Sequence, residues 1–101
     1  MTRLVVSRNA EHDMASILAY LEQEASAVVA EDFGRDVRRA LLRLVQFPES
    51  GAPRPELGPD ARVVVIHPYL LVYAHAAPNL TLLRILHGKA NLAAEILMRG
   101  S

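Results

Sequence analysis

The chain has 101 residues, no cysteine and a formal net charge of zero, and 51% of its residues are apolar. This length allows one domain with a real core, so we expect a single domain over residues 1–101. The composition argues against intrinsic disorder, disulfides and thiolate chemistry, and the neutral charge argues against nonspecific nucleic-acid binding as the main activity.

The chain also lacks the features of an exported or membrane protein. The apolar run near the amino terminus is too short for a signal peptide, and no stretch is long and apolar enough to span a bilayer. We therefore expect a cytoplasmic protein without a membrane partner. Residues 1–34 carry two cations against six acids, whereas residues 35–101 carry nine cations against five acids, so the second part is mildly basic.

A short strand from Arg3 to Ser7 and two helices are expected first. Ser7 or Asn9 is suited to cap the first helix, whose apolar stripe is Ala10, Met14, Ile17, Leu18 and Leu21. A polar break from Glu22 to Ser26 separates it from the second helix, expected from Ala27 to Phe47 and ended by Pro48. The apolar face of the second helix is Phe33, Val37, Ala40, Leu41, Leu44 and Val45, and four arginines lie opposite it: Arg35, Arg38, Arg39 and Arg43. The short connection predicts an antiparallel helical hairpin.

The rest of the chain predicts a sheet. Residues 51–60 are rich in Pro and Gly and are expected to form a loop. Three closely spaced strands follow, which favours an antiparallel meander: Ala61 to His67, Tyr69 to Ala76 and Leu80 to His87. Residues 91–98 are expected to form a short helix. The predicted fold class is α+β, with an N-terminal strand, an antiparallel α-helical hairpin, a three-stranded antiparallel meander and a short C-terminal helix.

The strands do not alternate between apolar and polar residues, as Val63–Ile66 and Leu70–Val72 illustrate. Both faces of such a sheet need cover, and the helical hairpin can cover only one. The other face is expected to meet the C-terminal segment, a second copy of the chain or a partner protein, which predicts a binding role.

Arg84 stands inside the apolar last strand, where a charge is costly unless its head group reaches water or a partner. A contact with another protein and an internal ion pair both remain open. On an extended strand Arg84 shares a face with Leu82 and Leu86. The other candidate partner-binding residues are Arg62, Tyr69, Tyr73 and His87, with core packing as the alternative for the tyrosines. The histidines lack the short spacing of a zinc site, and we expect neither a metal nor a cofactor.

Several motifs, in this order, resemble the ParE/RelE superfamily, the toxins of bacterial type II toxin–antitoxin modules. They are Ala10-x-x-Asp13, Leu44-x-x-Phe47-Pro48-x-x-Gly51-x-x-Arg54, Tyr69-Leu-Leu-Val-Tyr73 and Leu83-Arg-Ile-Leu-His-Gly88. The chain is most similar to the ParE-like branch, whose members bind DNA gyrase and perform no chemistry of their own. The resemblance implies a growth-arresting, plasmid-stabilising toxin that targets gyrase, binds a cognate ParD-like antitoxin in a hetero-oligomer, and makes no direct sequence-specific contact with nucleic acid. Arg84 then serves as a polar anchor in a binding surface.

Two alternatives stay open. A RelE-like ribosome-dependent mRNA endonuclease would draw its catalytic residues from Arg54, Arg62, Arg84, His87 and Lys89. Such an enzyme needs a basic cluster for phosphates and an acid or base near the C-terminus, and no Tyr or His follows His87, which favours the binding toxin. The second alternative is an inactive homologue that only binds an antitoxin.

Overall fold

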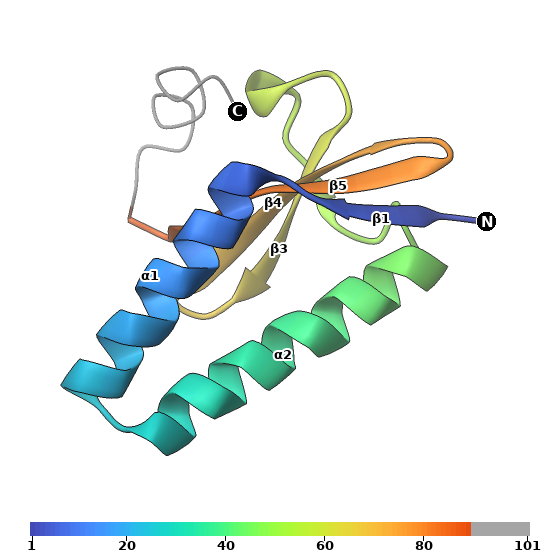
Figure 1. The fold of residues 1–101 in the computed structure, drawn as a ribbon. Coiled ribbons are helices and arrows are strands. Elements are labelled where there is room, and N and C mark those ends of the chain that lie inside the picture. Colours follow the sequence, from blue (N-terminus) through green and yellow to red (C-terminus); the bar gives the residue numbers. More distant parts are fainter. Residues whose placement is uncertain (90–101) are drawn as a thin grey trace.

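The computed structural model describes residues 1–89, which form a five-stranded sheet with two helices on one face (Figure 1). Within these residues no helix is long and apolar enough to cross a membrane. The helix expected over residues 91–98 lies outside the described part. The elements in chain order are β1 (Arg3–Val6), α1 (Arg8–Glu24), α2 (Ala27–Gln46), β2 (Ala52–Pro53), the 3₁₀ helix η1 (Pro55–Leu57), β3 (Ala61–Ile66), β4 (Tyr69–Ala76) and β5 (Asn79–His87).

The strand order is β1-β5-β4-β3-β2. The antiparallel meander is confirmed, because β4 pairs antiparallel with both β3 and β5. The first strand joins the same sheet, parallel to β5, in a register that runs from Arg3 opposite Asn79 to Val6 opposite Leu82. A parallel pair needs a long crossover connection, and here the helical hairpin and the intervening strands lie between the two.

The helix boundaries follow from capping side chains. The hydroxyl of Ser7, not Asn9, accepts the N–H of Ala10 at 3.0 Å and begins α1. The hydroxyl of Ser26 does the same for α2, accepting the N–H of Val29 at 3.1 Å. The first helix extends to Glu24, beyond the start of the expected polar break, and α2 ends one residue before Phe47.

The main core lies between the helices and the sheet. The predicted apolar faces of both helices are confirmed there: Phe33, Val37 and Leu44 are buried, and Met14, Ile17, Leu18 and Leu21 pack against the same cluster. From the sheet, Tyr69, Leu71 and Tyr73 contribute alternate residues of β4, as the period of a strand requires.

The Pro-rich segment 51–60 is not a loop throughout. Ala52 and Pro53 form the short edge strand β2 against β3, and η1 follows. From η1, Leu57 packs with Val63 and Val72 on the side of the sheet away from the helices. The far face therefore has a cover within the chain that the sequence-based expectation had not included.

A β-bulge in β5 changes which residues share a face. Val72 lies opposite Arg84 and Tyr73 lies opposite Leu82, so Leu83 is the extra residue. As a result Leu82 and Ile85 both belong to the helix-facing core. The prediction that Arg84 shares a face with Leu82 was wrong because it assumed a regular strand.

Candidate functional site

An apolar groove with a volume of about 500 Å³ lies between β1 and the two helices. We call it the apolar groove. Its walls come from three elements and from the core strand beneath: Leu4, Val6, Ala10, Glu11, Met14, Ala15, Leu18, Gly34, Val37, Arg38, Leu41, Leu42, Leu82 and Ile85. Only Glu11 and Arg38 carry charge.

Large aliphatic side chains on its walls remain in contact with water. Leu42 is 61% exposed, whereas Leu44, two residues further along α2, is 2% exposed. On β1, Leu4 and Val6 are exposed as well. A hollow with several exposed aliphatic groups and few charges is typical of a protein-binding surface.

Arg84 lies in the interior and is tied to α1. Its Nε and Nη2 atoms donate to Oδ2 and Oδ1 of Asp13 at 2.7 and 2.9 Å, and its side chain is 2% exposed. Oδ2 of Asp13 also accepts the N–H of Ile85 at 2.9 Å. The strand β1 pairs with β5 only as far as Val6. Beyond that point the carboxylate of Asp13 accepts the hydrogen bond from the edge of β5. Of the two readings of Arg84, the structure shows the internal ion pair.

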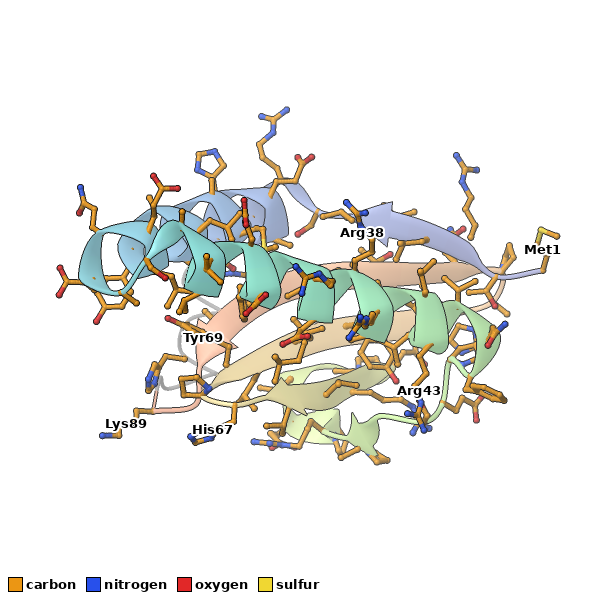
Figure 2. The ribbon with its side chains drawn as sticks, turned by 90° about the horizontal axis from the view of Figure 1, so that it is seen from below. Met1, Arg38, Arg43, His67, Tyr69 and Lys89 are labelled. Atoms are coloured by element: carbon orange, nitrogen blue, oxygen red, sulfur yellow. The ribbon has the colours of Figure 1, made fainter. Side chains whose placement is uncertain are left out.

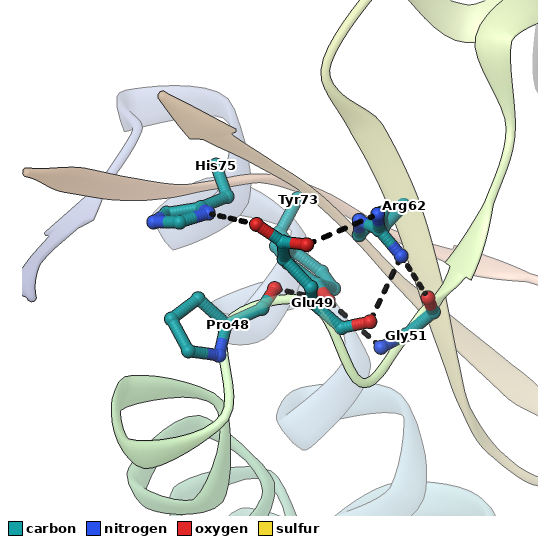
Figure 3. Close-up of polar contacts among 6 residues, drawn as sticks. All are labelled: Pro48, Glu49, Gly51, Arg62, Tyr73 and His75. Carbon is teal, nitrogen blue, oxygen red and sulfur yellow. Dashed lines mark hydrogen bonds and ion pairs between the residues drawn. The ribbon is translucent and has the colours of Figure 1, made fainter. Parts of the chain in front are cut away.

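A second set of polar contacts, shown in Figure 3, joins the end of α2 to β3 and β4; we call it the Tyr73 cluster. The Tyr73 hydroxyl donates to the carbonyl of Pro48 at 2.8 Å and accepts the N–H of Gly51 at 3.0 Å. Burial raises the pKa of this hydroxyl further above neutral pH, where a tyrosine is already protonated and can donate. A Cβ atom on Gly51 would lie 2.6 Å from the Tyr73 oxygen, which explains the glycine there.

Arg62 completes the Tyr73 cluster. Its Nη1 atom donates to the carbonyls of Glu49 and Gly51 at 2.9 and 2.8 Å. The carboxylate of Glu49 lies 3.9 Å from both Arg62 and His75, in a loose and solvent-exposed arrangement. Arg62 thus holds the chain segment that leads from α2 into β2, and part of its head group stays accessible.

Tyr69 and His87 form an aromatic group at the other end of β4. The Tyr69 ring is buried, 5.1 Å from the ring of Phe33 and 5.6 Å, edge-on, from the imidazole of His87. Burial also raises the pKa of the Tyr69 hydroxyl. His87 is exposed at the end of β5, where its Nδ1 atom accepts the N–H of Lys89 at 3.1 Å.

The five residues considered for a nuclease are not brought together. Arg54 pairs with Glu56 at 2.6 Å, and Arg62 and Arg84 are held as described above. Along β4, Arg62 lies opposite Tyr73 and His87 lies opposite Tyr69, a separation of roughly 13 Å at about 3.3 Å per residue. Residues 1–89 form no cluster of three or more His, Cys, Asp or Glu residues placed to hold a metal ion.

Two groups of residues were not recognised from sequence. Asp13 was noted only as part of the motif Ala10-x-x-Asp13, although an arginine in an apolar strand predicts a buried carboxylate somewhere in the chain. The groove residues Leu4, Val6 and Leu42 carried no signal of their own, because an exposed leucine and a core leucine on one helix look alike in sequence.

Comparisons with known proteins agree with this geometry. A family model described as the ParE toxin of the type II toxin–antitoxin system parDE matches residues 4–92. The toxin ParE3 of Caulobacter vibrioides is 27% identical over 96 residues, which cover 95% of this chain and 96% of that protein. A solved structure of the chromosomal ParDE toxin–antitoxin system from P. aeruginosa has the same fold, with a TM-score of 0.74 and 22% identity over 86% of this chain and 96% of that chain.

Proposed function

The chain belongs to the family of ParE toxins of type II toxin–antitoxin systems, and from this premise we propose that it arrests growth by binding DNA gyrase and that a co-encoded ParD-like antitoxin neutralises it. Both activities are binding activities and need no catalytic cluster. We also propose a cytoplasmic location, where both partners act. The apolar groove is the observation that best supports a protein partner.

The chemistry of the groove suits an amphipathic helix of the antitoxin. Its floor is aliphatic, and Leu42 on α2 and Leu4 and Val6 on β1 line an opening that residues 1–89 leave uncovered. Helix-in-groove binding places a row of apolar side chains along such a floor. Glu11 and Arg38 can then fix the orientation of the helix by pairing with charges on its polar face.

The five residues predicted to bind a partner divide according to exposure. We propose that His87 and Arg62, which remain accessible, contact the target or the antitoxin directly. Tyr69, Tyr73 and Arg84 are buried, and we propose that they act on binding only by holding the strands in place.

The target is tested by inducible expression with parallel measurement of the DNA-damage response and of translation. A gyrase poison is expected to induce the damage response before protein synthesis falls. Codon-linked mRNA cleavage on translating ribosomes would instead support the endonuclease, and normal growth on expression would support an inactive homologue.

The groove is tested with a matched pair of charge insertions. Leu42→Glu places a carboxylate in the groove and should weaken antitoxin binding roughly 100-fold, which is the size of a hot-spot loss. Val28→Glu changes an equally exposed residue outside the groove and should bind as the wild type does. Equal antitoxin affinity of the two variants, measured by titration calorimetry, would contradict the assignment of this groove.

A further inference from the structure

A second hollow lies on the other side of α2, between that helix and the edge of β3, with a volume of about 360 Å³. We call it the edge groove. Val64, Ile66, Ala40 and Leu44 give it an apolar floor, and Arg39 and Arg43 line its rim. It shares no lining residue with the apolar groove. Figure 2 shows the separation, since Arg38 and Arg43 leave α2 toward opposite sides.

The backbone of β3 is open along this groove. The neighbouring strand β2 covers only Arg62 and Val63, and the N–H of Arg54 closes the edge at Ala61. Residues 61, 63 and 65 direct their backbone groups to the same edge, so the N–H and C=O of Val65 point outward.

The residue that would continue β2 opposite Val65 is Ser50, but its N–H donates to the carbonyl of Phe47 at 3.0 Å. Within residues 1–89 no backbone hydrogen bond closes the edge at Val65, and this residue is 63% exposed. An uncovered strand edge of this kind can take up another extended chain.

The charges beside the edge indicate what kind of chain fits. Arg39 and Arg43 are exposed and one helical turn apart, and none of the ion pairs in the described part of the chain includes either of them. A nearby carboxylate, that of Glu49, lies closer to Arg62 and His75. A second copy of this chain would bring like charges together at this edge, whereas an acidic segment would pair with both arginines.

We propose that the edge groove binds an acidic, extended peptide segment of a partner protein, which adds as a strand beside β3. Its backbone pairs with the N–H and C=O of Val65, its apolar side chains lie on the floor, and its carboxylates reach Arg39 and Arg43. The inference goes beyond the proposed function, because the site lies across α2 from the apolar groove and requires neither gyrase nor an antitoxin.

The direct test is a titration of the isotope-labelled full chain with two blocked seven-residue peptides that alternate valine with glutamate or with lysine. The acidic peptide should shift the amide resonances of residues 64–66 and of Arg39 and Arg43, and should bind at least tenfold more tightly than the lysine peptide. Its affinity should fall as salt rises.

Two sets of variants test separately the contribution of the charges on Arg39 and Arg43 and that of the backbone of Val65. The double change Arg39→Glu and Arg43→Glu should reverse the preference in favour of the lysine peptide, whereas Arg8→Glu, on an exposed arginine of α1, should leave it unchanged. Val65→Pro removes the outward N–H without touching the ladder to β4 and should abolish binding, while Val65→Thr should not.

Four results would overturn the proposal. The two peptides could bind equally well, the shifted resonances could map to the apolar groove, or charge reversal could leave the preference unchanged. Self-association of the chain through residues 64–66, seen by sedimentation and by the same resonances, would assign the edge to a second copy instead.

Discussion

The apolar side chains that line the apolar groove are exposed to water, whereas the polar side chains that form contacts within the sheet are shielded from it. Leu42 in the groove is 61% exposed, whereas Arg84 and Tyr73 in the sheet are 2% and 0% exposed. Every buried side-chain nitrogen and oxygen among the described residues has a hydrogen-bond partner. Leucines that resemble core residues thus form the open surface, and an arginine and a tyrosine that resemble contact residues hold the fold together.

The difference has an energetic reason. A buried charge or hydroxyl is tolerated only when its partners are complete, so Arg84 and Tyr73 are tied to Asp13, Pro48 and Gly51. An exposed aliphatic group costs little in the folded monomer, but it releases about 25 cal/mol per Å² when a partner covers it. Changes to the hydrogen-bonded partners of Arg84 and Tyr73 should therefore reduce stability, and changes to the apolar groove should reduce the affinity for a partner.

The largest expected effect is on the Arg84–Asp13 pair. Asp13→Ala removes the carboxylate that binds the buried guanidinium and the N–H of Ile85, and should lower the free energy of unfolding by about 3–5 kcal/mol. Asp32→Ala breaks the exposed pair with Arg35 and should cost less than about 1 kcal/mol. Urea denaturation of both variants measures the contrast, and equal losses would show that burial does not distinguish the two pairs.

The second effect is steric and concerns two glycines. Gly51→Ala would push a methyl group against the Tyr73 ring, which is buried and cannot yield, so we expect a loss of about 1–3 kcal/mol. Gly34→Ala is the matched control, because its added carbon would meet Met14 and Leu18 at 3.8 and 3.9 Å, an ordinary contact, in the middle of α2.

Helix propensity should make the control neutral or stabilising by up to about 1 kcal/mol. Thermal unfolding of the Gly51→Ala and Gly34→Ala variants measures the difference in stability. If Gly51→Ala melted at the wild-type temperature, the Tyr73 cluster would be more adaptable than its contacts indicate.

A smaller effect should appear at high pH. Burial raises the pKa of Tyr73 in the folded state, so above the unfolded value of about 10 the unfolded chain releases a proton that the folded chain keeps. The free energy of unfolding should therefore be unaffected by this group below pH 10 and fall as the pH rises further. Tyr73→Phe should make that fall shallower, as measured by denaturation between pH 9 and about 11.5. An unchanged slope would mean that Tyr73 does not contribute to it.

Sequence reasoning worked where a signal is local. The helices were predictable from the serine caps and the apolar period, and the meander was predictable from strand length and spacing. The edge strand β2 was missed because two residues with a proline carry no strand pattern. The bulge at Leu83 has no marker in the sequence either, and it alone places Leu82 and Arg84 on opposite faces of the sheet.

The site was less accessible to sequence reasoning, because its contacts join distant parts of the chain. Asp13 and Arg84 are 71 residues apart, and only the parallel pairing of β1 with β5 brings α1 to the strand that carries the arginine. The apolar groove exists because β1 and the two helices do not pack fully against one another. No single residue in the sequence determines that arrangement. The family resemblance, by contrast, rests on the order of short motifs and was visible without any contact.

The smallest expected effect on stability is that of Leu42→Ala, and its contrast with Leu44→Ala is the sharpest test of the comparison between the two regions. Leu42→Ala and Leu44→Ala delete the same atoms two positions apart on α2. Leu44 is buried against Tyr73 and Leu80, so its truncation should cost about 2–5 kcal/mol. Leu42 lines the open groove and is 61% exposed, so its truncation should change the free energy of unfolding by no more than about 0.5 kcal/mol while weakening the antitoxin complex. A loss at Leu42 as large as that at Leu44 would mean that the groove closes in solution, and its leucines would then belong to the core after all.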